Sequence, residues 1–319
     1  MTSMSSRQFA IFRLALGIYL AIHFAALVPY GAELFSNRGV LADPRLNFTF
    51  GILPNLLEHH DSPAFVTGFL IALSILATAF ALGIFRRFAA VLLWYGWACL
   101  FNRNNLINNP SIPYIGMLLL LTLLVPGGEG LAPKASNREW KFPMMIYWTA
   151  WILMATGYSY SGWMKLQSPS WVDGSALDHV LNNPLARPGF IRDALLALPA
   201  PCLHALTWAS LASELLFLPL SVNQRTRLIA WTALAVMNLG IVFAINFADL
   251  TAGMLLLHLF TFDSRWLVVW RLNFRQTSDA RDKILRTLEM LAFHSLSLDG
   301  GFVARLGLPS TKSATDSRL

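Results

Sequence analysis

Five apolar stretches of about 20 residues constrain this sequence more than any other feature. They cover residues 9–28, 64–85, 142–164, 201–220 and 228–247, and the acidic and basic residues inside them are Arg13 and Glu214. A helix needs about 20 apolar residues to cross the hydrocarbon core of a membrane. Three shorter runs, at 88–101, 112–125 and 250–262, would span only with polar residues at one end. The pattern predicts an all-α, polytopic (multi-pass) membrane bundle of about eight transmembrane helices.

The composition excludes the main soluble classes. Of the 319 residues, 55% are hydrophobic and only 13% are charged, about half the charged share of a soluble domain. The chain is also far too apolar for intrinsic disorder. A net charge of +7 would suggest a nucleic-acid partner in a soluble protein. Here the charges sort by membrane side, so we expect the lipid bilayer and no nucleic acid as partner.

The positions of the basic residues predict the orientation. Cytoplasmic loops carry the excess of Lys and Arg in membrane proteins. With a cytoplasmic N-terminus, 18 of the 24 Lys and Arg residues fall on the cytoplasmic side. We therefore expect an integral protein of the bacterial inner membrane, with both termini inside and the first helix retained as a signal anchor.

The chain is expected to form one transmembrane domain, residues 1–270, and a basic cytoplasmic tail, residues 271–319. Within the tail, residues 279–293 place apolar side chains at helical spacing beside basic ones. This pattern is typical of an amphipathic helix on an anionic leaflet, and equally of a helix packed on the protein. A further short helix is predicted at 190–198, on the outer side.

Asparagines gather in the outer loop between the third and fourth expected helices. Five of them lie between residues 102 and 109, among them Asn105, Asn108 and Asn109. Each amide needs hydrogen-bond partners, which hydrocarbon does not offer. The cluster predicts either a water-filled depression or an ordinary solvated loop.

The fifth long helix ends with a lysine. Tyr158, Ser161 and Lys165 share one helical face by their spacing. Such a lysine is commonly an anchor that reaches for the membrane surface. The alternative is a lysine in a low-dielectric pocket, where the amine loses its proton more readily and can act as a base.

Other ionisable residues lie inside the apolar runs. Arg13 and Glu214 are at similar expected depth and opposite in charge, which favours a structural ion pair; a proton relay through Glu214 and His258 is the alternative. The intramembrane histidines lie on separate helices, and the two cysteines form no C-x-x-C motif. No metal site is therefore predicted.

One segment resembles a known family. Residues 158–166, Tyr-Ser-Tyr-Ser-Gly-Trp-Met-Lys-Leu, followed by Pro-Ser-Trp-Val-Asp-Gly at 169–174, look like the lysine segment of vitamin K-dependent gamma-carboxylase. Weaker matches are Arg-Gly-Val-Leu at 38–41 and the Asn-Asn pair at 108–109 before Tyr-Ile-Gly at 114–116. Over roughly residues 7–270, the chain resembles the HTTM (horizontally transferred transmembrane domain) group, which shares the membrane core of that carboxylase.

The resemblance implies a function for Lys165. In the carboxylase, the lysine is regarded as the base that starts oxidation of a reduced quinone (vitamin K hydroquinone) by O₂, at an outward-facing site. The carboxylase has a histidine shortly after the paired asparagines, where this chain has Pro110 and Ser111. The chain also shows no counterpart of its large peptide-binding domain. Gamma-carboxylation of a protein is therefore not implied.

We formulate two main hypotheses. The first is a membrane enzyme, a quinol-dependent oxidase or carboxylase-like lyase acting on a small lipid or peptide substrate, with a reduced quinone as cofactor. Its base would be Lys165 and its anion clamp Arg38, and its substrate-binding lining would be Asn105, Asn108, Asn109, Tyr158 and Ser161. The second is a non-catalytic scaffold or lipid/peptide-binding partner, for example in peptide or toxin maturation. A transporter comes third, because the polar residues concentrate on one side.

Overall fold

The computed structural model describes residues 4–130, 140–247 and 249–266. The chain divides into two units, Met1–Phe262 and Asp263–Leu319, and the helices below belong to the first. Of the second unit, residues 263–266 are described, and there the Asp263 carboxylate binds the Arg265 guanidinium at 2.6 Å. The predicted tail helix at 279–293 and the basic loop residues Lys134 and Arg138 lie outside the described residues.

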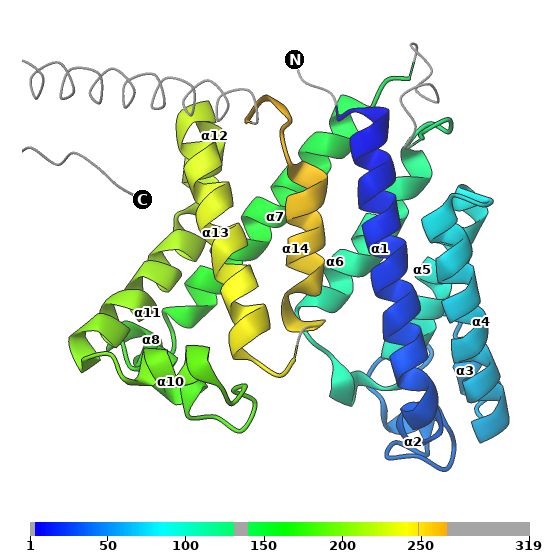
Figure 1. Cartoon of the computed structure of the whole chain (residues 1–319). Coiled ribbons are helices and arrows are strands. Elements are labelled where there is room, and N and C mark those ends of the chain that lie inside the picture. The colour runs from blue at the N-terminus through cyan, green and yellow to red at the C-terminus, as the bar shows by residue number, and fades with distance from the viewer. Residues whose placement is uncertain (1–3, 131–139, 248, 267–319) are drawn as a thin grey trace, which may run out of the picture. The chain divides into compact units, whose positions relative to one another are not determined.

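The regular elements of the described residues are helices (Figure 1). The first half of the chain forms α1 (Ser6–Leu27), η1 (Val28–Tyr30), α2 (Gly31–Phe35), η2 (Pro44–Leu46), α3 (Leu56–His59), α4 (Pro63–Leu82), α5 (Arg86–Arg103), η3 (Asn105–Ile107) and α6 (Ser111–Leu124). The second half forms α7 (Met144–Lys165), α8 (Pro169–Val172), α9 (Ala176–Leu181), α10 (Phe190–Leu196), α11 (Ala200–Leu215), α12 (Phe217–Val222), α13 (Gln224–Ala244) and α14 (Asp249–Thr261). Every predicted apolar run contains a helix, and the all-α prediction is confirmed.

Local sequence signals explain where these helices begin and end. The Ser5 hydroxyl accepts the N–H of Gln8 at the start of α1, and Ser62 does the same for Phe65 at the start of α4. These side chains satisfy N–H groups that the first turn of a helix leaves unpaired. Helix α4 ends at Leu82 and is capped by Gly83, whose φ of 83° lies in the left-handed region that glycine adopts without strain.

Three helical stretches are long and apolar enough to cross a membrane: Ser6–Phe35, Pro63–Leu82 and Gln224–Ala244. A fourth span is counted if α10 and α11, between which the chain bends by 112°, are taken as one broken span. Helices α6 and α14 have 14 and 13 residues, and at 1.5 Å per residue they cover only about 20 Å of a hydrocarbon core about 30 Å thick. Length and composition of the described helices therefore support a membrane protein with three or four spans, and the predicted number of eight is not confirmed by this criterion.

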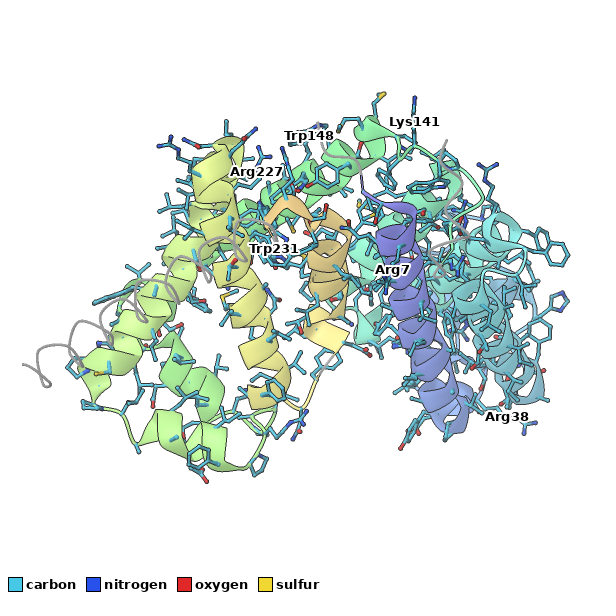
Figure 2. All side chains as sticks on the ribbon, turned by 45° about the horizontal axis from the view of Figure 1, so that its top comes forward. Arg7, Arg38, Lys141, Trp148, Arg227 and Trp231 are labelled. Atoms are coloured by element: carbon cyan, nitrogen blue, oxygen red, sulfur yellow. The ribbon has the colours of Figure 1, made fainter. Side chains whose placement is uncertain are left out.

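Contacts between helix ends show which ends of the helices lie together. Near the start of α1, Arg13 meets Glu129 after α6, and Glu129 also meets Arg86 at the start of α5. At the other end, the Arg103 guanidinium of α5 donates to the carbonyl of Leu41. Figure 2 shows Lys141 and Arg227 at the end where α1 begins, and Arg38 at the opposite end. We call these the Arg7 end and the Arg38 end.

The helices pack closely inside the bundle and present apolar side chains outside. A Cβ at Gly17 of α1 would lie 2.6 Å from the Cβ of Ala81 on α4, so a glycine is required at this contact. Small residues allow such close approach of membrane helices. On α13, Ile229, Val236 and Phe243 recur every seven residues and are all more than half exposed. An exposed apolar stripe of this kind fits contact with lipid.

Candidate functional site

A pocket of about 380 Å³ lies between α5 and α6 near the Arg38 end. Its walls are apolar and aromatic, and amide side chains line it at the end where α5 stops. The lining residues are Phe48, Thr49, Trp94, Trp97, Ala98, Phe101, Asn102, Asn105, Asn108, Ile112, Pro113, Gly116, Met117 and Leu120. No acidic or basic side chain is among them. We call this cavity the α5–α6 pocket.

The amides of the α5–α6 pocket belong to a network that joins two loops. The Asn105 amide donates to the side-chain oxygens of Asn47 and Thr49. The Asn47 amide and the Thr49 hydroxyl in turn donate to the carbonyl of Asn102. Asn108 is exposed at the mouth of the pocket. The polar end of the pocket is therefore held in place, while Asn108 is available to a ligand.

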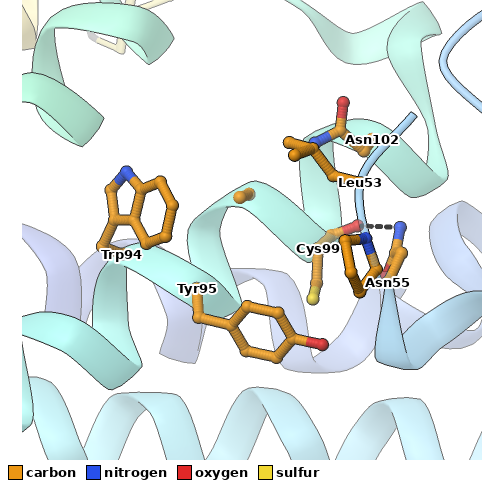
Figure 3. Close-up of a pocket in the computed structure, with 8 residues that line it drawn as sticks. Leu53, Asn55, Trp94, Tyr95, Cys99 and Asn102 are labelled. Carbon is orange, nitrogen blue, oxygen red and sulfur yellow. Dashed lines mark hydrogen bonds between the residues drawn. The ribbon is translucent and has the colours of Figure 1, made fainter.

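A second hollow of about 250 Å³ lies between α5 and the segment that holds Leu53 and Asn55 (Figure 3). Both cavities share Trp94, Ala98 and Asn102, which are four residues apart and so lie on one helical face. In this second hollow the Asn55 amide donates to the carbonyl of Cys99 at 3.0 Å. The face of α5 that carries Trp94, Ala98 and Asn102 thus borders both cavities.

Buried polar contacts fix the loops beneath the pocket. The Arg103 side chain is fully buried and donates to the carbonyls of Leu41 and Ala42, at 2.7 and 3.3 Å. Asn104 donates to the carbonyl of Leu34 at 2.7 Å. The side-chain oxygen of Asn109 accepts the N–H of Ser111, the first residue of α6, at 2.9 Å. Asn109 therefore holds the turn before α6 and is not part of the pocket lining.

Lys165 lies at the end of α7 and binds α11. Its Nζ is 2.7 Å from Oε1 of Glu214 and 4.2 Å from the centroid of the Trp171 ring. The Lys165 side chain keeps 24% of its surface exposed, whereas Glu214 keeps 6%. A carboxylate and an indole face both attract an ammonium group. Lys165 is thus reachable from outside but held by two partners.

The predicted ion pair between Arg13 and Glu214 is wrong. Arg13 binds Glu129 at 2.8 Å, and Glu214 binds Lys165. The prediction counted depth along unbroken helices and left out Glu129, which lies in the loop after α6 and returns to the Arg7 end. Helix α11 in fact ends at Leu215, so Glu214 is not carried along a single straight span.

Glu214 lies next to a break in the helix, between α11 and α12. Pro219 has no N–H, so it leaves the carbonyl of Leu215 without its helical partner. The hydroxyl of Ser159 on α7 donates to this carbonyl at 3.1 Å and accepts the N–H of Leu218 at 3.0 Å. Irregular backbone at membrane depth requires such partners inside the protein. Ser159 therefore supports the break beside the Lys165–Glu214 pair.

Tyr158 lies in a buried network on the inner side of α7. Its hydroxyl is 2.9 Å from Nε2 of His258 on α14, and it accepts the amide of Asn238 on α13 at 2.7 Å. Ser161 is half-buried on the same helix. A Cβ at Gly162 would lie 2.6 Å from the backbone nitrogen of Leu215. The predicted face of α7 thus packs against α11, and Tyr158 joins α7 to α13 and α14.

The segment after α7 is tied to the start of α11. The Trp208 indole donates to the carbonyl of Val172 at 3.1 Å, and Gly174 adopts a φ of 90° against His204. Asp173 accepts the N–H of Ser175 at 2.8 Å, and hydrogen bonds from the hydroxyl and N–H of Ser175 hold the pKa of the Asp173 carboxyl below its usual range. These contacts position Trp171 over Lys165.

The predicted site residues fall in separate places. Asn105 and Asn108 line the α5–α6 pocket, which does not include Lys165, Tyr158 or Ser161 in its lining. Arg38 is exposed in the turn after α2, where its N–H donates to the Ser36 hydroxyl at 3.1 Å. Among the described residues, no group of three or more His, Cys, Asp or Glu gathers in a metal-binding arrangement.

Sequence reasoning missed several residues of the α5–α6 pocket. Asn47 and Thr49 reach it from the first outer loop, and Trp94 and Trp97 form its wall. The four-residue spacing of Trp94, Ala98 and Asn102 was a usable signal, because it extends the asparagine cluster into a face of α5. No local signal ties the Asn47 loop to α5.

Comparison of the chain with protein-family models, with curated proteins and with solved structures gives no match. The resemblance to the HTTM group rests on the chain's own residues at 38–41, 108–116 and 158–174.

Proposed function

We propose that this protein is a multi-pass membrane protein that binds an uncharged amphipathic lipid, of the quinone or quinol class, in the α5–α6 pocket. The single observation that carries the proposal is a largely apolar cavity that two indoles and three amide side chains line. Ligand sites are commonly apolar cavities with a few well-placed polar groups. The exposed amide of Asn108 is the group we assign to the lipid head.

The lining of the pocket argues for the chemical class of the ligand. Amides donate to carbonyl and hydroxyl oxygens, which are the polar groups of quinones and quinols. Because the lining holds no acidic or basic side chain, a charged head group would lack a partner there. Trp94 and Trp97 offer flat aromatic faces, against which a ring can stack.

The arrangement of the helices supports the topology that goes with this proposal. The contacts at the two ends are those of a chain that passes repeatedly from the Arg7 end to the Arg38 end. We propose eight passes with the Arg7 end in the cytoplasm, because short cytoplasmic loops carry the basic excess. In a bacterial inner membrane, the amides of the α5–α6 pocket would then face the outer leaflet.

Gly116 on α6 gives the sharpest test. A Cβ at this position would lie 3.8 Å from Trp97 and 3.9 Å from Trp94. A leucine side chain at residue 116 would therefore extend between the two indoles and fill part of the pocket. Gly68 on α4 is the matched control, because a Cβ there meets nothing within 4 Å. We expect quinone to be extracted from purified wild-type protein and from Gly68→Leu, and to be lost from Gly116→Leu. Equal quinone in Gly116→Leu, or none in the wild type, would overturn the proposal.

A second candidate is catalysis at Lys165, as the resemblance to the carboxylase core implies. Two observations favour it: Lys165 is partly exposed, and Oε2 of its partner Glu214 has no hydrogen-bond partner among the described residues. A carboxylate with one free oxygen can receive a proton from the ammonium and return it. In this candidate Lys165 is the base for quinol oxidation, and O₂ consumption by reconstituted protein given a quinol is the measurement.

A further inference from the structure

A basic cavity of about 510 Å³ opens at the Arg7 end. It is formed where α4, α5 and the segment after α6 meet α1. Its lining includes Arg13, Phe85, Arg86, Arg87, Phe88 and Glu129. We call it the arginine cavity.

Arg86 joins the segments that surround the arginine cavity. Its guanidinium donates to the carbonyls of Thr122, Val125 and Pro126, and its Nε is 2.9 Å from Oε1 of Glu129. The last carbonyls of a helix have no partner within the helix, so Arg86 supplies partners at the end of α6. All the contacts of Arg86 are thus structural.

The charges of the arginine cavity do not balance. Arg13 and Arg86 share a single carboxylate oxygen, Oε1 of Glu129, and Arg87 adds a third guanidinium. Arg13 keeps only 9% of its side chain exposed, and its Nε is buried without a hydrogen-bond partner among the described residues. Burying positive charge without full compensation is unfavourable. An anion beside Arg13 and Arg87 would compensate this excess.

Exposed apolar side chains surround the opening of the arginine cavity. Phe85 and Phe88 are 81% and 65% exposed, and Leu82 and Ile84 lie next to them. Phe85 has a φ of 44°, which is uncommon for a residue other than glycine. A cavity with arginines inside and aromatic rings at its edge matches an anion that carries hydrocarbon chains.

We propose that the arginine cavity binds the phosphate of an anionic phospholipid, with Arg13 and Arg87 as its ligands and the acyl chains against Phe85 and Phe88. The inference is independent of the α5–α6 pocket, which lies near the opposite end of the bundle and carries no charge. It assigns the Arg7 end a specific lipid in addition to general attraction to an anionic leaflet.

The test uses the full chain in detergent micelles and native mass spectrometry with phosphatidylglycerol or phosphatidylcholine. We expect phosphatidylglycerol to bind preferentially to the wild type. Arg87→Gln should reduce this preference about fivefold, the factor for one basic side chain near an anionic lipid. Arg87 is exposed and makes no carboxylate contact among the described residues, so the variant should fold. Arg225→Gln, an exposed arginine at the start of α13, is the control and should leave the preference unchanged.

Three outcomes would overturn the proposal. They are equal binding of both lipids by the wild type, an unchanged preference in Arg87→Gln, and an equal reduction in Arg225→Gln. Inorganic phosphate distinguishes a lipid site from a site for a free anion. We expect added phosphate to leave phosphatidylglycerol bound, because the acyl chains contribute to binding; complete displacement by phosphate would assign the cavity to a free anion.

Discussion

The ammonium nitrogen of Lys165 lies 2.7 Å from Oε1 of Glu214, beside the break between α11 and α12. This pair joins the end of α7 to a helix whose regular hydrogen bonding is interrupted there. Glu214 is buried, so its charge depends on Lys165 for compensation. The pair therefore has a structural role whether or not Lys165 also takes part in chemistry.

The Lys165–Glu214 pair should be energetically coupled. Lys165→Met leaves a buried carboxylate unpaired and should lower the free energy of unfolding by about 2–4 kcal/mol, somewhat below the cost for a fully buried pair because Lys165 is partly exposed. The double variant with Glu214→Gln should cost less than the sum of the single changes. Unfolding titrations in mixed micelles measure this. Arg13→Met combined with Glu214→Gln is the control, and there we expect the costs to add.

Glu129 should be critical for the Arg7 end, because it is the carboxylate that Arg13 and Arg86 share. Glu129→Gln keeps the size of the side chain but leaves two buried guanidinium groups uncompensated. We expect a loss of about 3–5 kcal/mol in the free energy of unfolding. Glu33→Gln on α2, which makes no ion pair among the described residues, should change stability little. Similar losses in the two variants would contradict the arrangement.

The hydroxyl of Ser159 should stabilise the break between α11 and α12. Ser159→Ala removes the partner of the Leu215 carbonyl and should cost about 1–3 kcal/mol, the penalty of an unsatisfied buried polar group. Adding Pro219→Ala should recover part of the loss, because the new N–H can bond to Leu215. Ser161→Ala, on a neighbouring half-buried position, serves as the comparison. No recovery by Pro219→Ala would argue against this explanation of the break.

Tyr158 should contribute to stability through its hydroxyl. Tyr158→Phe removes the hydrogen bonds to His258 and Asn238 and leaves both groups buried without that partner. A decrease of about 1–3 kcal/mol is expected in the same titrations. Tyr160→Phe is the matched control, since Tyr160 is 66% exposed on the same helix. A smaller effect at Tyr158 than at Tyr160 would refute the buried network.

Lys165→Arg separates the two candidate functions. Arginine keeps the positive charge near Glu214 but stays protonated, so it cannot act as a base. If lipid binding in the α5–α6 pocket is the function, Lys165→Arg should retain bound quinone and complement a deletion strain, whereas Asn108→Leu should not. Asn37→Leu, which is exposed outside the pocket, is the control. Loss of complementation by Lys165→Arg with quinone still bound would favour catalysis at Lys165.

The long apolar runs predicted which segments are helical, because hydrophobic runs of this length are a local signal. Ser5, Ser62 and Gly83 cap α1 and α4 in the structure, and these residue types are a further local signal that the sequence analysis did not use. It did not predict the partner of Arg13, because Glu129 lies in a loop whose position depends on the packing of α5 and α6. Pro219 does signal the break after α11, and this signal was overlooked.

The candidate site was predictable only in part. The asparagine cluster at 102–109 pointed to the polar end of the α5–α6 pocket, and Asn105 and Asn108 do line it. The hypothesis of one site that also includes Lys165 and Arg38 assumed that the polar groups on one side of the membrane lie close together. The contacts of these residues instead depend on helix packing, which puts Lys165 against α11 and leaves Arg38 exposed.

Photolabelling tests the central claim, lipid binding in the α5–α6 pocket, most directly. A photoreactive quinone analogue would be added to the reconstituted full chain, and the labelled residues would be mapped by peptide mass spectrometry. We predict saturable labelling on α5 and α6, around Trp94 and Met117, that excess natural quinone prevents and Gly116→Leu abolishes. Labelling confined to α7 and α11 around Lys165, or labelling that excess quinone does not reduce, would contradict the account.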